Sequence, residues 1–204
     1  PYAELSKRID LMLKAMEDGA ARIKKIISEL KDFSRPTETD MESEIDVNLV
    51  VEKSLNLTHS ILKKATRHLS VDYGNNLPKI SGNSQKLQQV IINLLVNACQ
   101  ALENPKQFIH VKTSKISNAS FIVIEVSDSG PGVPPKNLEK LKNPFFTTRR
   151  DDGGTGLGLS ISEKIVNDHK GILEFTSKSG EGLTVKILLP IITEENIISK
   201  NRIS

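Results

Sequence analysis

Four glycines fall within the ten residues DDGGTGLGLS, from Asp151 to Ser160, directly before an amphipathic segment that predicts a helix. Free backbone amides at the start of a helix attract phosphate, and the helix dipole strengthens that attraction. The run lacks the G-x-x-x-x-G-K-[ST] spacing of the P-loop, and it does not follow a strand as a dinucleotide-binding fingerprint does. The glycines therefore indicate either a plain hinge or a phosphate contact of another kind.

Three amide side chains share one face of the helix predicted over residues 84–103. Gln89, Asn93 and Asn97 are spaced four apart, so they stack along that helix. An amide oxygen is a reasonable ligand for Mg²⁺ beside phosphates, because the phosphates supply most of the negative charge. Taken alone, the pattern is more typical of a solvated polar face.

Asp128 ends a predicted strand, and Gly130 and Gly132 follow it on either side of Pro131. A carboxylate in this place can accept hydrogen bonds from an amino group and an N–H of a ligand, or from the backbone amides of a turn. The glycines allow the backbone to approach a ligand closely. By itself the stretch is explained by the turn.

Composition narrows the function classes. The 204 residues are 37% apolar and 26% charged, with a net charge of +3 and only 4% aromatic residues, which argues against nucleic-acid binding by base stacking. Cys99 is the single cysteine, so an internal disulfide framework is excluded. No run reaches the roughly 18 apolar residues of a membrane-spanning helix. The chain starts at Pro1, so we expect it to be part of a longer protein.

A long helix is predicted near the N-terminus, ending before Pro36. Its apolar or small residues follow a 3.5-residue period, which is typical of a coiled-coil or bundle seam. These seam positions are Leu5, Ile9, Met12, Met16, Gly19, Ile23, Ile26, Leu30 and Phe33. The seam indicates a partner helix from a second copy of the chain; the alternative is a helix that folds back on its own domain.

The rest of the chain alternates between strand and helix patterns. Strands are predicted near residues 43–48, 68–73, 78–83, 107–117, 120–130 and in the final 171–190. Helices are predicted from a cap near Asn48 to Ala65, from the cap Asn83 to Glu103, over 137–142, and from the glycine run to His169. We expect helices on one face of a largely antiparallel sheet, followed by a frayed tail.

The motifs occur in a fixed order: NLLVNACQAL, DSGPGVP, NPFFTTR, GGTGLGLSIS and GEGLTVKILLP. Together they resemble the ATP-binding domain of sensor histidine kinases of two-component systems, which belongs to the GHKL type. The resemblance covers residues 44–190. GAARIKKIISELKDFSRP is similar to the second helix of the dimerisation and phosphoacceptor hairpin of that family.

The resemblance implies an α+β fold, the two-layer α/β sandwich called the Bergerat ATP-binding fold, preceded by the long helix. It implies a partial dimerisation helix over 1–36, a linker over 37–44, an ATP-binding catalytic domain over 45–190 and a tail over 191–204. The implied ligands are ATP and Mg²⁺. Asn97, assisted by Asn93, would bind the metal, and Asp128 would accept a hydrogen bond from the adenine amino group.

Further ATP-binding residues are carried over from the same motifs. The glycines and leucines of GGTGLGLSIS would form the hinge of a lid and contact the phosphates. Thr184 would lie near the adenine, and Arg149 could reach the γ-phosphate. The full implied set adds Gly130, Gly132, Phe145, Thr147, Thr148, Gly154, Thr155, Gly156, Leu157, Gly158 and Leu159. Gln100 departs from the family, which often has a basic residue there, so we expect modest affinity.

The implied activity is that of a protein-histidine kinase, which passes the γ-phosphoryl group to a histidine and then to a response regulator. Hydrolytic relatives carry a glutamate at the position of Asn93, and an amide is no general base, so water attack should be slow. His59, His68, His110 and His169 do not fit the phosphoacceptor motif. We therefore expect no autophosphorylation by this chain alone.

The implied partners are the receiver domain of a response regulator and a second copy of the chain, joined through the N-terminal helix, with no nucleic acid. The catalytic region would be cytoplasmic. Any anchor in the inner membrane would lie upstream of Pro1. The alternative function is a non-catalytic module for dimerisation and regulator docking, with a degenerate ATP site.

Overall fold

The structure is a computed structural model that describes residues 4, 6–14, 16–17, 19–20, 23, 27, 42–116, 119–147 and 154–192. Every described residue between positions 4 and 27 is helical, which agrees with the predicted N-terminal helix. Four described seam residues expose between 48% and 69% of their surface: Ile9, Met12, Met16 and Ile23. The seam positions Leu5, Ile26, Leu30 and Phe33, and most of the predicted linker and tail, lie outside the described residues.

Five strands form one sheet in the order β2-β4-β5-β7-β6. Its neighbouring strands are antiparallel, except that β2 and β4 run parallel, so the predicted, largely antiparallel sheet is confirmed. The five strands are β2 (His68–Asp72), β4 (Phe108–Lys115), β5 (Phe121–Asp128), β6 (Ile172–Ser177) and β7 (Leu183–Pro190). The short strands β1 (Glu42–Ile45) and β3 (Ile80–Gly82) pair with each other in a separate sheet.

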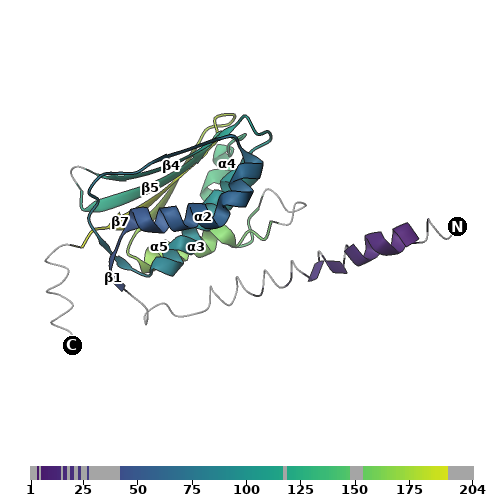
Figure 1. Cartoon of the computed structure of the whole chain (residues 1–204), viewed down its shortest axis with the longest axis horizontal. Coiled ribbons are helices and arrows are strands. Elements are labelled where there is room, and N and C mark those ends of the chain that lie inside the picture. Colours follow the sequence, from purple (N-terminus) through teal and green to yellow (C-terminus); the bar gives the residue numbers. More distant parts are fainter. Residues whose placement is uncertain are drawn as a thin grey trace.

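Helices α2 (Val47–Ala65), α3 (Ser84–Ala101) and α5 (Gly158–Asp168) cover one face of the five-stranded sheet (Figure 1). Two short turns of helix, α4 (Pro135–Leu138) and η1 (Glu139–Lys142), precede α5. This arrangement is the predicted two-layer α/β sandwich. None of the helices in the described ranges has both the length and the apolar character that crossing a bilayer requires.

The core fills the space between the two layers. Helix α3 buries an apolar stripe of Leu87, Ile91, Leu94 and Ala98, each no more than 4% exposed. Alternate residues of the strands face these helices, because side chains of a strand point to opposite faces in turn. The inner face includes Ile109 and Val111 of β4, Ile122, Ile124 and Val126 of β5, and Val185, Ile187 and Leu189 of β7. Burial of these apolar groups holds α3 over the centre of the sheet.

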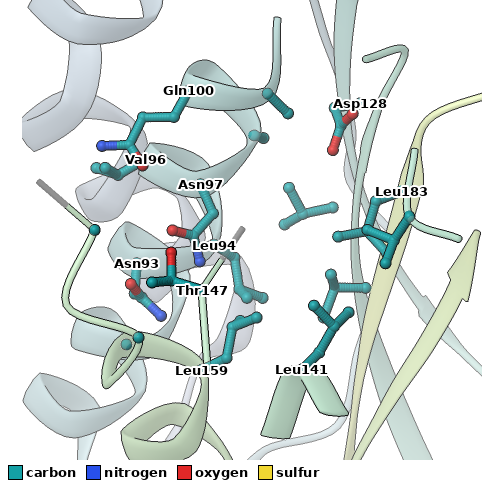
Figure 2. A pocket seen from close by; sticks show the side chains of 18 of the residues that line it. Asn93, Leu94, Val96, Asn97, Gln100, Asp128, Leu141, Thr147, Leu159 and Leu183 are labelled. Carbon is teal, nitrogen blue, oxygen red and sulfur yellow. The ribbon is translucent and has the colours of Figure 1, made fainter. Parts of the chain in front are cut away.

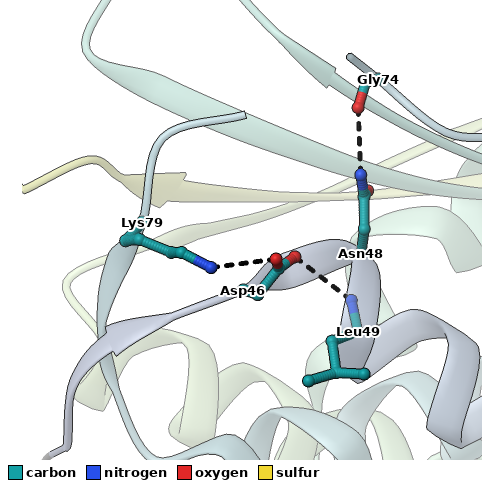
Figure 3. Close-up of polar contacts among 5 residues, drawn as sticks. All are labelled: Asp46, Asn48, Leu49, Gly74 and Lys79. Atoms are coloured by element: carbon teal, nitrogen blue, oxygen red, sulfur yellow. Dashed lines mark hydrogen bonds and ion pairs between the residues drawn. The ribbon is translucent and has the colours of Figure 1, made fainter. Parts of the chain in front are cut away.

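The start of α2 corrects the predicted cap. Asp46, and not Asn48, is the N-cap: its Oδ1 accepts a hydrogen bond from the Leu49 amide at 3.3 Å, and its Oδ2 accepts one from Lys79 Nζ at 2.9 Å (Figure 3). Asn48 instead donates to the Gly74 carbonyl at 3.0 Å and accepts from the Thr113 hydroxyl. Asn48 therefore ties α2 to the sheet, which the sequence pattern alone does not distinguish from capping.

Asp46 should contribute a pH-dependent part of the stability. The Lys79 ammonium and the Leu49 amide hold the pKa of this carboxyl below its ordinary value of 3.8. Because the folded pKa is the lower one, the contribution is complete above pH 3.8 and is lost as the pH falls through the folded pKa. We expect Asp46→Ala to lower the free energy of unfolding by about 1 kcal/mol at pH 7, measured by urea denaturation.

Asp46→Asn separates the two contacts, because it keeps a cap oxygen but removes the charge that Lys79 pairs with. It should cost less than Asp46→Ala at pH 7, and its difference from the wild type should shrink as the pH falls below 3.8. An Asp46→Ala protein as stable as the wild type at pH 7 would contradict the assignment of this cap.

Cys99 should be unreactive while the protein is folded. Its side chain lies on α3 and is 8% exposed, and burial raises the pKa of the thiol to about 11. The reactive thiolate is therefore scarce at neutral pH. We expect a thiol reagent such as dithionitrobenzoate to modify Cys99 at pH 7.5 only as the chain unfolds in denaturant. Rapid stoichiometric labelling of the native protein would contradict this burial.

Candidate functional site

A pocket of about 320 Å³ opens between the helical layer and the sheet. One wall is α3, with Asn93, Asn97 and Gln100, and the opposite wall is the sheet near Asp128 (Figure 2). The segment that leads into α5 and its first two residues close a third side, with residues 154–156, 158 and 159. The pocket therefore joins three parts of the chain that are far apart in sequence.

Most of the predicted binding residues line this pocket. Those that do are Asn93, Asn97, Asp128, Gly132, Thr147, Gly154, Thr155, Gly156, Gly158 and Leu159. Thr148 and Arg149 lie outside the described residues. Gly130, Phe145, Leu157 and Thr184 are described and do not line it.

Thr184 faces the wrong way to meet a ligand in the pocket. Its hydroxyl is 2.8 Å from that of Ser127, its partner on β5, on the face of the sheet opposite the helices. Its neighbours Leu183 and Val185 line the pocket in its place. Thr184 therefore lies outside the pocket lining, because side chains alternate between the two faces of a strand, and its contact with adenine stays a prediction.

The other three non-lining residues support the pocket from behind. Gly130 donates its amide to Asp128 Oδ1 at 2.8 Å, which orients that carboxylate. Phe145 is 56% exposed, but its backbone amide donates to the Gly156 carbonyl at 2.9 Å. Leu157 is 3% exposed and belongs to the core. None of the three lines the pocket, and each contacts or packs beside a residue that does.

The lining also includes apolar residues that sequence reasoning missed. They come from α3, from the neighbouring strands β5 and β7, and from the loop and helical turns after Asp128. They are Leu94, Val96, Ala98, Ala101, Val126, Pro131, Val133, Leu141, Phe146, Leu183 and Val185. The residues on α3 could have been found from their spacing to Asn93 and Asn97, and Phe146 from the motif NPFFTTR, whereas nothing in the sequence marks Leu141. Together they form an apolar slot suited to a flat organic group.

Asp128 is the only ionisable side chain among the described residues that line the pocket. It is 6% exposed and lies where β5 ends, across the pocket from the two asparagines (Figure 2). A carboxylate accepts hydrogen bonds, and each of its two oxygens can accept more than one. One end of the pocket can therefore accept from an amino group, while the other end offers neutral amides.

Asn93 is held by the start of α5. Its Nδ2 donates to Ser162 Oγ at 2.9 Å. A Cβ added at Gly158 would lie 2.4 Å from Asn93 Oδ1, so only glycine fits against this amide. Gly156 has a φ of +70°, and a Cβ there would lie 2.5 Å from the Phe145 backbone. Gly158 therefore lets the start of α5 lie close to α3, and Gly156 lets the segment before it lie against Phe145.

The oxygen atoms that line the pocket could bind a hard cation only together with oxygens of a bound phosphate group. Nowhere in the described ranges do three or more His, Cys, Asp or Glu side chains gather to hold a metal. The amides of Asn93 and Asn97 line the pocket and offer neutral oxygen atoms. Mg²⁺ is commonly held by a few protein oxygens together with substrate phosphates. The pocket therefore suits Mg²⁺ bound to a phosphate ester.

Comparison with known proteins agrees with this geometry. Residues 82–193 match the family described as histidine kinase-, DNA gyrase B-, and HSP90-like ATPase. The chain is 30% identical to the sensor histidine kinase ZraS of Salmonella typhi, over 90% of this chain and 38% of that protein. It is 33% identical to the signal transduction histidine-protein kinase AtoS of Escherichia coli, over 85% of this chain and 28% of that protein.

A solved structure shares the fold. The nucleotide-free catalytic domain of the histidine kinase ThkA is 25% identical to this chain, with a TM-score of 0.65. The match covers 74% of this chain and 98% of that domain. By contrast, the chain spans less than two fifths of the length of ZraS or AtoS.

Gly158→Ala should weaken binding of a magnesium nucleotide at least tenfold, because the new Cβ would displace Asn93 Oδ1. Alanine favours a helix over glycine by about 1 kcal/mol, so a loss of folding is not the expected cause. Calorimetric titration with ATP and Mg²⁺ measures the effect. Gly19→Ala is the matched control, since Gly19 is also helical and has nothing within 4 Å of the added Cβ. Equal affinity in the two variants would contradict this reading of Gly158.

Proposed function

Because the chain belongs to the histidine kinase-, DNA gyrase B-, and HSP90-like ATPase family, we propose that it is the ATP-binding catalytic part of a sensor histidine kinase. The observation that carries the proposal is the pocket itself, with Asp128 on one wall and Asn93 and Asn97 on the other. The similarity to ZraS and AtoS supports the kinase class over other members of the family.

The adenine ring would lie at the Asp128 end. The buried carboxylate can accept a hydrogen bond from the exocyclic amino group, which guanine lacks at the corresponding position. Val126, Leu183 and Val185 line the same wall and would exclude water around the base. A buried carboxylate gives strong selection, because guanine would place an acceptor oxygen, and not a donor, against it.

The phosphates would lie at the amide end. Asn93 and Asn97 would hold Mg²⁺, which would neutralise charge on the β- and γ-phosphates when bound. Thr147, Thr155 and the Gly156 region line this side and can contact phosphate oxygens. Arg149, which lies outside the described residues, would add a positive charge near the γ-phosphate.

The neutral amide end favours phosphoryl transfer over hydrolysis. No described lining residue near Asn93 and Asn97 is a carboxylate or histidine that could take a proton from water. Bound ATP should therefore persist until a stronger nucleophile arrives. The proposed nucleophile is a histidine nitrogen of a dimerisation hairpin, which attacks the γ-phosphorus as the bond to the bridging oxygen breaks and ADP leaves. His59, His68, His110 and His169 do not line the pocket.

The proposed partners follow from the same class. A receiver domain of a response regulator would take the phosphoryl group from the histidine. The N-terminal helix would pair with a second copy of the chain, which is supported by the exposure of its seam residues Ile9, Met12, Met16 and Ile23. The catalytic region would work in the cytoplasm, where ATP is available.

Wild-type protein should bind ATP with Mg²⁺ in the micromolar range and bind GTP far more weakly. Asp128→Asn should lower ATP affinity at least tenfold, because the amide can offer its NH₂ group where an acceptor is needed. Calorimetry measures both effects. Asp72→Asn is the matched control, since Asp72 has a carboxylate that is 69% exposed on the edge strand β2. Unchanged ATP affinity in Asp128→Asn would reject the adenine assignment.

The reaction class is tested by adding radiolabelled ATP and a histidine-bearing hairpin of the same protein. A kinase should label the hairpin with acid-labile phosphate while free phosphate appears slowly. Failure to bind ATP would favour the alternative, a non-catalytic module for dimerisation and regulator docking. Rapid steady-state release of phosphate would instead indicate a hydrolytic relative, and either result would overturn the proposal.

A further inference from the structure

We infer that Ser162 is a positioning residue that sets the amide orientation of Asn93, so that Asn93 presents its oxygen to the cation that accompanies the nucleotide. This inference rests on the proposed function and adds a residue of α5 that does not itself line the pocket. Ser162 lies four residues after Gly158, one turn into the helix. It is the last residue of the motif GGTGLGLSIS, but the motif assigns it no role.

Ser162 takes part in a chain of two hydrogen bonds. Its Oγ donates to the Gly158 carbonyl at 2.9 Å and accepts from Asn93 Nδ2 at 2.9 Å. Ser162 is 2% exposed, so water has little access to this hydroxyl. The Gly158 carbonyl, the Ser162 hydroxyl and the Asn93 amide therefore form a buried hydrogen-bonded chain where α5 packs on α3.

The direction of these bonds fixes which end of the amide points where. A hydroxyl has a single hydrogen, and here it is given to Gly158, so the oxygen can only accept from Asn93. Only the NH₂ group of the Asn93 amide can donate, so this group faces Ser162 and Oδ1 faces away from the Ser162 hydroxyl. Reversing the amide would take the hydroxyl away from Gly158 and turn the NH₂ group toward the Gly158 backbone, where Oδ1 now lies.

Orientation matters because the two ends of an amide have opposite chemistry. Oxygen can ligate Mg²⁺, whereas an NH₂ group cannot. In Figure 2 the oxygen of Asn93 is turned toward the side where the oxygens of Asn97 and Thr147 lie. An asparagine without a fixed neighbour would sample both orientations, and part of the population would offer no ligand.

Ser162→Ala tests the inference by removing the hydroxyl while preserving helix propensity. We expect the gain in ATP affinity on adding Mg²⁺ to fall about tenfold, as is usual when a group that orients a metal ligand is removed. ATP affinity in EDTA should be unchanged. Calorimetric titrations of the 204-residue chain with ATP, in Mg²⁺ and in EDTA, give both values.

Ser160→Ala is the matched control on the same helix. Ser160 is 7% exposed, and its hydroxyl donates to the Leu157 carbonyl at 2.9 Å in the same manner as Ser162 does to Gly158. It should keep the full Mg²⁺ effect. Thermal unfolding of both variants shows whether either substitution disturbs the fold.

A double-mutant cycle with Asn93→Ala isolates the coupling. In that background Ser162→Ala should cause no further loss of the Mg²⁺ effect, because the amide that it orients is gone. A normal Mg²⁺ effect in Ser162→Ala, or an equal loss of affinity with and without Mg²⁺, would overturn the inference. If the wild type bound no ATP, the proposed function would fail first, so the two failures are distinguishable.

Discussion

The packing of α5 against α3 is the contact on which the site depends. Two buried polar contacts hold it, one at each end of the shared surface. The Asn93 side chain donates to Ser162 near the start of α5. The backbone amide of Asn83 donates to His169 Nε2 at 2.8 Å near the end of α5. The His169 ring is 2% exposed, and its Nδ1 is 2.6 Å from the Ile165 carbonyl. With both ends held, the residues just before α5 have a fixed place against the amides of α3.

The two-layer fold divides the chemistry of the pocket between two walls. The charged acceptor, Asp128, ends the central strand β5, while Asn93 and Asn97 lie on the helix packed above it. The separation of the walls is set by apolar residues such as Leu94 and Val126, which line the pocket floor and continue into the core. A change in core packing would therefore alter how well one nucleotide reaches both ends, without touching any polar residue of the site.

Particular residues show how far prediction from sequence could go. Asn97 and Asp128 line one pocket, and the motif that contains each of them is local and lies in a well-defined element. Thr184 lies outside the lining because a shift of one residue along a strand moves a side chain to the other face, so that Leu183 and Val185 face the pocket in its place. Ser162 ends the motif GGTGLGLSIS, but nothing in the sequence shows that it contacts Asn93.

The sequence by itself determined the layout of helices and strands, the apolar stripe of α3, and the identity of the motifs that place the chain in its family. These are local properties, since periodicity, caps and glycine spacing act over a few residues. Only the tertiary structure decided which face of β7 meets the pocket, which residue caps α2, and which hydroxyl orients Asn93. Each of these depends on contacts between segments such as α3 and α5, whose mutual position is fixed by packing rather than by spacing along the chain.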